Sequence, residues 1–220
     1  MSGIDKIADM LKVMMQGTVI SLQAFIFTLL FAVPLAALIC VGRMSKLKVV
    51  KYPIQLLLLI VRGTPLMLQL ITVYFVLPMA LSSLGIKIDR FVAAVIALSI
   101  NYACYFAEIY RGGFESISHG QYEACTVLGY NRWQTFIHII CPQVIKRIVP
   151  AMGNETMTLV KDTALVNVIG ISELLIVSKK MASSMANILP LFIAGAFYLL
   201  MNAVVAFAFN KLEKKLSYYK

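Results

Sequence analysis

Long apolar runs constrain this chain more than any other feature. Five runs are long enough to cross a lipid bilayer, at about residues 17–41, 52–81, 91–110, 147–165 and 188–210. A bilayer has a hydrocarbon core ~30 Å thick, so a spanning helix needs about 20 mainly apolar residues. The composition agrees, because 60% of the residues are hydrophobic and only 14% are charged, against about 25% charged in soluble domains. We therefore predict an all-α integral membrane protein with five transmembrane helices.

Two of the five runs are interrupted. The run at 52–81 contains Arg62-Gly63-Thr64-Pro65. Proline lacks the backbone N–H that a helix needs and glycine is flexible, so we expect this helix to break there. The run at 147–165 is the least apolar of the set, because it contains Glu155, Lys161 and Asp162.

The distribution of basic residues predicts the orientation. Of the twenty Lys and Arg residues, twelve flank the runs on one side, six lie on the other and two lie within runs. Loops with an excess of Lys and Arg remain in the cytoplasm, which places the N-terminus outside and the C-terminus in the cytoplasm of a bacterial plasma membrane. The twelve are Arg43, Lys46, Lys48, Lys51, Arg111, Arg132, Lys146, Arg147, Lys211, Lys214, Lys215 and Lys220.

The net charge of +10 does not indicate nucleic-acid binding. The basic residues lie in short loops and form no stripe with interleaved aromatic residues, which favours contact with anionic membrane lipid. The cysteines are scattered without a Cys-x-x-Cys pair, so we predict free thiols and no metal site. The two histidines have no neighbouring ligand set. The cysteines are Cys40, Cys104, Cys125 and Cys141.

Three segments of different character divide the chain. Residues 1–16 predict an amphipathic helix in the membrane interface, because apolar residues recur at helical spacing. Residues 17–212 form one transmembrane domain with a long cytoplasmic loop at 111–147, and residues 213–220 form a cytoplasmic tail. The apolar face of the first segment comprises Ile4, Ile7, Leu11 and Met15.

The loop at 111–147 contains a spaced motif. Glu123-Ala124-Cys125 is followed by three residues, Gly129, nine residues, Ile139, one residue and Cys141-Pro142. This pattern resembles the Glu-Ala-Ala loop of ATP-binding-cassette (ABC) importer permeases, with Cys125 and Cys141 as small or apolar replacements. We expect a short helix that ends at Gly129 in the left-handed conformation. The resemblance implies that Glu123, Ala124, Cys125 and Gly129 dock an ATPase subunit.

Several polar residues fall near the middle of the predicted spans, where such residues are costly and usually functional. At a rise of about 1.5 Å per residue, Arg62 and Asn101 lie at similar depth, and Glu155 and Asp162 share a helix face. An amino acid carries one carboxylate and one ammonium group. Arg62 or backbone amides freed at the break could bind the first, and Glu155 or Asp162 the second. The alternative for Arg62 is an ion pair that only holds helices together.

A narrower resemblance covers about residues 17–212. Val61 to Gln69 resembles the Arg-Gly-Thr-Pro signature of polar amino-acid permeases, and further signatures follow at Tyr105–Gly112, Gly120–Ala124 and Lys161–Thr163, with Ala164 where the family usually has Ser. It implies a type I ABC importer transmembrane domain of the MetI-like fold, working as a dimer with two ATPases. It also implies that the substrate site is lined by Gly63, Thr64, Glu155 and Asp162.

The predicted function is therefore the permease subunit of an ABC importer for a polar amino acid, and Glu155 favours a basic or cystine-like one. The chain has no phosphate loop, so it binds no cofactor itself, and ATP and Mg belong to the ATPase. Its other partners would be a second permease copy, identical or similar, and an extracytoplasmic amino-acid-binding protein.

The alternatives are an ABC permease for another small solute and a membrane scaffold or channel. An enzyme is disfavoured, because the runs contain no histidine and no nucleophile motif. Glu108 and Arg111, three residues apart, predict an ion pair at a helix end.

Overall fold

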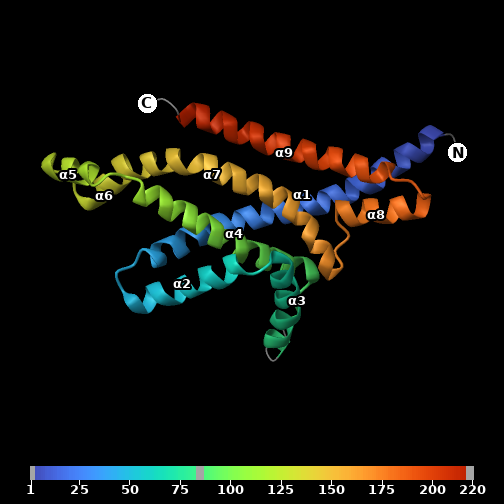
Figure 1. Ribbon diagram of the computed structural model, residues 1–220, viewed down its shortest axis with the longest axis horizontal. Coiled ribbons are helices and arrows are strands. Elements are labelled where there is room, and N and C mark those ends of the chain that lie inside the picture. The colour runs from blue at the N-terminus through green and yellow to red at the C-terminus, as the bar shows by residue number, and fades with distance from the viewer. Residues whose placement is uncertain (1–2, 83–86, 217–220) are drawn as a thin grey trace.

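The computed structural model describes residues 3–82 and 87–216, and every regular element within these ranges is helical (Figure 1). This confirms the predicted all-α class. The elements are α1 (Gly3–Arg43), α2 (Lys48–Gly63), α3 (Leu66–Ser82), α4 (Arg90–Glu115), α5 (His119–Val127), α6 (Arg132–Gln134), the π-helix η1 (Thr135–Ile140), α7 (Cys141–Asp162), the 3₁₀-helix η2 (Thr163–Ile169), α8 (Leu174–Met185) and α9 (Leu189–Leu216).

Four long helices set the shape of the molecule. Figure 1 shows α1, α4, α7 and α9 following its long axis, with α5 and α6 at one end and α8 and the N-terminus at the other. The connection from α1 to α2 lies toward the α5 end, and so does the C-terminal end of α9. The loops with most of the basic residues therefore gather at one end, as a common membrane side requires.

Length and composition alone identify fewer spans than the sequence predicts. Among the described residues, three helices are apolar and long enough to cross a membrane: Asp9–Arg43, Arg90–Glu115 and Leu189–Leu216. The pair α2 and α3 gives a fourth if it is counted as one span. The remaining predicted span falls on α7, which packs between α4 and α9. Because of its charged residues, α7 does not qualify as a span by composition. Charged residues inside membranes usually face the interior of the helix bundle, and the position of α7 between two other helices permits this.

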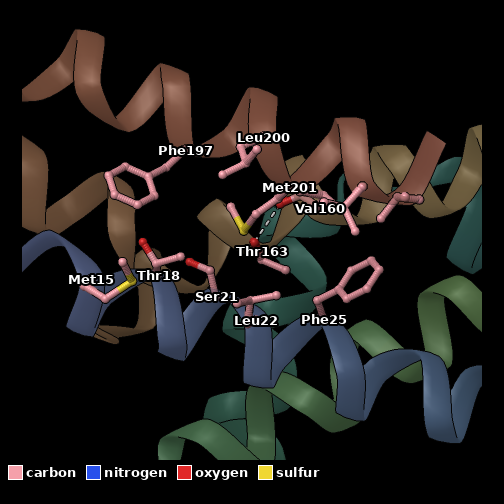
Figure 2. Close-up of a pocket in the computed structure, with 12 residues that line it drawn as sticks. Met15, Thr18, Ser21, Leu22, Phe25, Val160, Thr163, Phe197, Leu200 and Met201 are labelled. Carbon is pink, nitrogen blue, oxygen red and sulfur yellow. Dashed lines mark hydrogen bonds between the residues drawn. The ribbon is translucent and has the colours of Figure 1, made fainter. Parts of the chain in front are cut away.

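Small residues let the two central helices approach closely. Ala32 and Ala36 on α1 and Ala94 and Ala97 on α4 are each no more than 2% exposed. Packing through small side chains is typical of membrane helices, whose association gains little from the hydrophobic effect. By contrast, α9 packs against α7 and α8, and a cavity separates its middle from α1 (Figure 2).

The N-terminal segment is the start of the first long helix. α1 is continuous from Gly3 to Arg43, and the residues that it buries against α8 and α9 are Met10 and Met14, at 3% and 0% exposure. Leu11 and Met15, on the predicted apolar face, are 39% and 50% exposed, so they do not pack against the protein. α8 folds back onto the face of α1 that contains Met10 and Met14. Ile4 and Ile7 lie outside the residues whose side chains are described, and the interfacial position of residues 1–16 stays a prediction.

The contact between α1 and α8 provides a test of this packing. A Cβ on Gly17 would lie 2.9 Å from Leu174 Cα and 3.1 Å from the carbonyl carbon of Glu173. Both are backbone atoms that cannot rotate away, so Gly17→Ala must separate the helices. We expect the free energy of unfolding to fall by about 1–3 kcal/mol, which would be seen as a lower unfolding temperature of the purified protein. Gly195→Ala on α9 is the control, because its Cβ meets nothing within 4 Å. Equal stability of the two variants would contradict this close approach.

Candidate functional site

The break between α2 and α3 is a fixed structure. The chain bends by 114° there, with Thr64 in an extended conformation. The carbonyl of Val61 would accept a hydrogen bond from residue 65 in a continuous helix, but Pro65 has no N–H. Gln69 replaces that donor, because its Nε2 lies 2.7 Å from the Val61 carbonyl oxygen and 2.9 Å from Thr64 Oγ1. The predicted break is therefore confirmed, and its exposed backbone is satisfied by a side chain.

Gln69 also connects the break to α4. Asn101 Nδ2 donates a hydrogen bond to Gln69 Oε1 at 2.9 Å, and Asn101 is 5% exposed. The structure thus brings together two predicted site residues, Thr64 and Asn101, through a third that the sequence analysis quoted but did not single out. An amide side chain four residues after a helix-breaking proline is the signal that could have identified it.

The two predicted acids lie on α7. Asp162 is near its C-terminal end, and Asp162 Oδ2 accepts a hydrogen bond from Tyr102 Oη at 2.7 Å. Tyr102 is 1% exposed and was not predicted as a site residue. Glu155 is half-buried and has no hydrogen-bond or salt-bridge partner within the described ranges. Asp162 is therefore oriented by the protein, whereas the carboxylate of Glu155 still lacks a partner.

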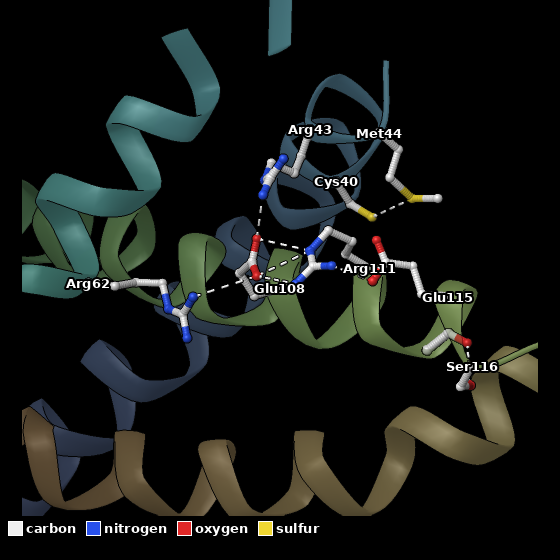
Figure 3. A network of polar contacts seen from close by, with 9 residues as sticks. Cys40, Arg43, Met44, Arg62, Glu108, Arg111, Glu115 and Ser116 are labelled. Carbon is white, nitrogen blue, oxygen red and sulfur yellow. Dashed lines mark hydrogen bonds and ion pairs between the residues drawn. The ribbon is translucent and has the colours of Figure 1, made fainter. Parts of the chain in front are cut away.

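Arg62 takes part in a different cluster. Figure 3 shows Glu108 among three guanidinium groups, and its carboxylate oxygens lie 2.8 Å from Arg111 Nη2, 3.5 Å from Arg43 Nε and 3.6 Å from Arg62 Nη1. Glu115 pairs with the same Arg111. The predicted pair of Glu108 and Arg111 is confirmed, and the cluster joins α1, α2 and α4.

An open pocket of about 540 Å³ lies beside this cluster. The guanidinium of Arg62 stands over the ring of Tyr105, 5.4 Å from its centroid, and its side chain is 43% exposed. Arg62 has the ion-pairing role that the sequence left open, and it also borders the pocket together with Gly63. In the described chain, no hydrogen bond or ion pair joins Arg62 to Glu155 or Asp162. The predicted site residues thus lie around the break and along α7, and no direct bond joins the two groups among the described residues.

The α5 segment has the predicted end. Gly129 has a φ of +77°, Tyr130 N donates to the Cys125 carbonyl at 2.9 Å, and Gly129 N donates to the Thr126 carbonyl at 3.1 Å. These two bonds define the glycine-terminated Schellman motif. Glu123 and Ala124 are exposed, whereas Cys125 is 3% exposed. Of the four predicted docking residues, Cys125 alone is buried, and it packs α5 against the protein, whereas Glu123, Ala124 and Gly129 are exposed.

An apolar surface at the same end of the molecule was not predicted. Val127, Leu128 and Trp133 are 88%, 73% and 70% exposed. Trp133 stacks on Phe136 with ring centroids 6.1 Å apart, and Phe136 stacks on Phe114 of α4 at 5.9 Å. Exposed apolar surface marks interaction sites, and this one is joined to a central helix through three aromatic rings.

The fold and these features define a multi-span helical membrane protein with a broken span and an exposed helical segment at one end. Residues 24–218 match the family described as binding-protein-dependent transport system inner membrane component. The chain belongs to this family. The predicted membership of the ABC importer permeases is thereby confirmed, and the chain is a transport subunit.

Curated relatives agree with the family. The chain is 39% identical over 158 residues, 71% of each chain, to the glutamine transport system permease protein GlnP of Escherichia coli. It is 35% identical to the arginine transport system permease protein ArtQ of Bacillus subtilis, over 92% of this chain and 91% of the relative. A probable amino-acid ABC transporter permease, y4tG of Sinorhizobium fredii, is 34% identical over 90% of this chain and 84% of its own length.

Solved structures confirm the fold. A crystal structure of an amino acid ABC transporter with histidines superposes with a TM-score of 0.84 and 29% identity, covering 98% of this chain and 99% of the other. The MetNI methionine ABC transporter matches with a TM-score of 0.68 over 90% of this chain and 92% of the other, at 17% identity. The type I importer fold is therefore the fold of this chain.

Proposed function

We propose that the chain is the non-catalytic permease subunit of an ABC importer that moves a polar amino acid inward across the bacterial plasma membrane. The observation that carries this proposal is the α5 segment, an exposed helix with a fixed end that stands at one end of a bundle of membrane helices. Because the sequence lacks a phosphate loop, hydrolysis of ATP with Mg belongs to a separate ATPase subunit. A second permease copy and an extracytoplasmic binding protein complete the importer.

In this proposal the α5 end faces the cytoplasm and the N-terminus faces outside. Glu123 and Ala124 contact the ATPase directly, and Gly129 sets the end of the docking helix. The exposed side chains of Val127, Leu128 and Trp133 extend the contact, because apolar and aromatic residues supply most of the energy of an interface. Residues 1–16 lie in the interface on the external side of the plasma membrane, residues 17–212 form the transmembrane domain, and residues 213–220 form a cytoplasmic tail.

The substrate site in this proposal lies where the break in span two meets α7. Gly63 and Thr64 present backbone groups, Asn101 keeps the break in place through Gln69, and Asp162 is oriented by Tyr102. The α-ammonium group of an amino acid pairs with Asp162. Glu155 lacks a partner in the described structure, so a second cationic group on the substrate would neutralise it, which favours a basic amino acid or cystine. Arg62, at the neighbouring pocket, meets the carboxylate.

Substitution of Glu155 tests this site. Glu155→Gln removes the charge and keeps the shape, so we expect uptake of a basic amino acid by the reconstituted importer to fall at least about tenfold, because loss of a charged hydrogen bond costs about 1.5–3 kcal/mol. Copurification of the ATPase should not change. Glu213→Gln, which removes the same charge near the end of α9, is the matched control. Unchanged uptake by the Glu155 variant would remove Glu155 from the site.

A further inference from the structure

A cavity of about 400 Å³ lies between α1, α9 and the junction of α7 with η2. Figure 2 shows Leu22 and Phe25 reaching it from α1, and Phe197 and Leu200 from α9. It is separate from the pocket beside Arg62, and none of the candidate site residues lines it. Its lining contains no charged side chain.

The few polar groups in the lining are already satisfied. Thr18 Oγ1 donates to the Met14 carbonyl at 3.0 Å, and Thr163 Oγ1 donates to the Val160 carbonyl at 2.7 Å. Ser21 Oγ donates to its own helix at 3.3 Å and accepts from Leu174 N at 3.4 Å. Because each hydroxyl proton is donated to a backbone carbonyl, the lining offers no free hydrogen-bond donor and no charge. A zwitterionic amino acid would lose its hydration there with little compensation, so the cavity is a poor site for the transported substrate.

Most of the cavity wall belongs to α1 and α9, both of which are apolar and long enough to span a membrane. From Met15 to Phe25 the α1 wall is ~15 Å long at the ordinary helical rise, which is about half of a ~30 Å hydrocarbon core. On α9 the neighbouring Leu200 and Val204 are 63% and 62% exposed. The cavity therefore opens beside apolar surface at the depth of one leaflet.

We propose that this cavity binds one acyl chain of a membrane phospholipid, inserted between α1 and α9. The apolar lining, the satisfied hydroxyls and the length of one leaflet all match a hydrocarbon chain. The acyl chain would fill the space between the helices and so support α9 where α9 does not pack on α1. In the proposed orientation this leaflet is the outer one, and the class of ligand does not depend on the orientation.

Quenching by brominated lipid tests the proposal directly. Trp133 is the single tryptophan of the sequence, so a Trp133→Phe background accepts one reporter at a time. Phe197→Trp and Leu200→Trp report from the cavity, and Phe207→Trp, at a position 71% exposed on the same helix, is the control. The full-length permease is purified in detergent that contains, per protein, a few molecules of phosphatidylcholine brominated on its acyl chains.

We expect most of the fluorescence of the two cavity reporters to be lost at this low lipid content, while the control reporter keeps nearly all of its signal until the protein enters bilayers of the same lipid. Native mass spectrometry should show a retained phospholipid. Two results would overturn the proposal. Quenching of cavity and control reporters in parallel at every lipid content would indicate ordinary boundary lipid. Cavity reporters that stay unquenched in brominated bilayers would indicate that protein, such as a second copy, fills the space. Neither result depends on uptake, so failure here is distinguishable from failure of the proposed function.

Discussion

Replacement of Gly129 by valine is expected to reduce amino-acid uptake at least about tenfold. The φ of +77° costs a residue with a side chain roughly 1–2 kcal/mol, and more if it is β-branched. No atom lies within 4 Å of the position of a Cβ, so the effect comes from the backbone and not from a steric clash. Relief of the strain would break the two hydrogen bonds that end α5 and would reorient the surface proposed to dock the ATPase.

Two variants make this prediction specific. Gly120→Ala lies in the same helix and meets only Ser118 Oγ at 4.0 Å, so it should transport normally. Gly129→Asn should recover part of the activity, because asparagine adopts the left-handed conformation at lower cost. Uptake by the reconstituted importer and copurification of the ATPase are the measurements. If Gly129→Val transports as well as Gly120→Ala, the end of α5 has no part in coupling.

Removal of the charge of Glu108 is expected to destabilise the protein by about 1–2 kcal/mol, since a partly buried charged network loses its central acid and solvent screens part of the effect. The Glu108 side chain is 16% exposed and is shared by Arg43, Arg62 and Arg111. In Glu108→Gln these three cations would retain a single acid, Glu115, and they would repel one another where α1, α2 and α4 meet. The measurement is the unfolding temperature of the purified protein in detergent.

The neighbouring acid is the control for this prediction. Glu115 is 58% exposed and pairs with Arg111 alone, and exposed pairs contribute little. Glu115→Gln should therefore leave the unfolding temperature nearly unchanged. Addition of Arg62→Leu to Glu108→Gln should restore part of the loss, because it removes one of the unbalanced charges. Equal effects of the two single substitutions would show that Glu108 is not the centre of the network.

The polar site could be predicted only in part. Pro65 and Asp162 were identified from sequence, since a proline inside an apolar run and an acid within a span are unusual in themselves. Gln69 and Tyr102 were not, because their importance depends on partners 32 and 60 residues away, Asn101 and Asp162. The position of Gln69 four residues after Pro65 indicates a role at the break, but neither its sequence position nor that of Tyr102 indicates the distant partner.

Sequence alone determined the features that local chemistry dictates: membrane-spanning helices from apolar length, a break where Pro65 lacks an N–H, and the end of α5 at a glycine. Tertiary structure alone decided which faces meet. It selected Met10 and Met14 over Leu11 and Met15 as buried residues of α1, turned Cys125 inward, and placed Glu108 among three arginines. The physical reason is that backbone preferences act within a few residues. A helix with apolar residues on all sides can pack through any face, and which face it buries depends on the neighbouring helices.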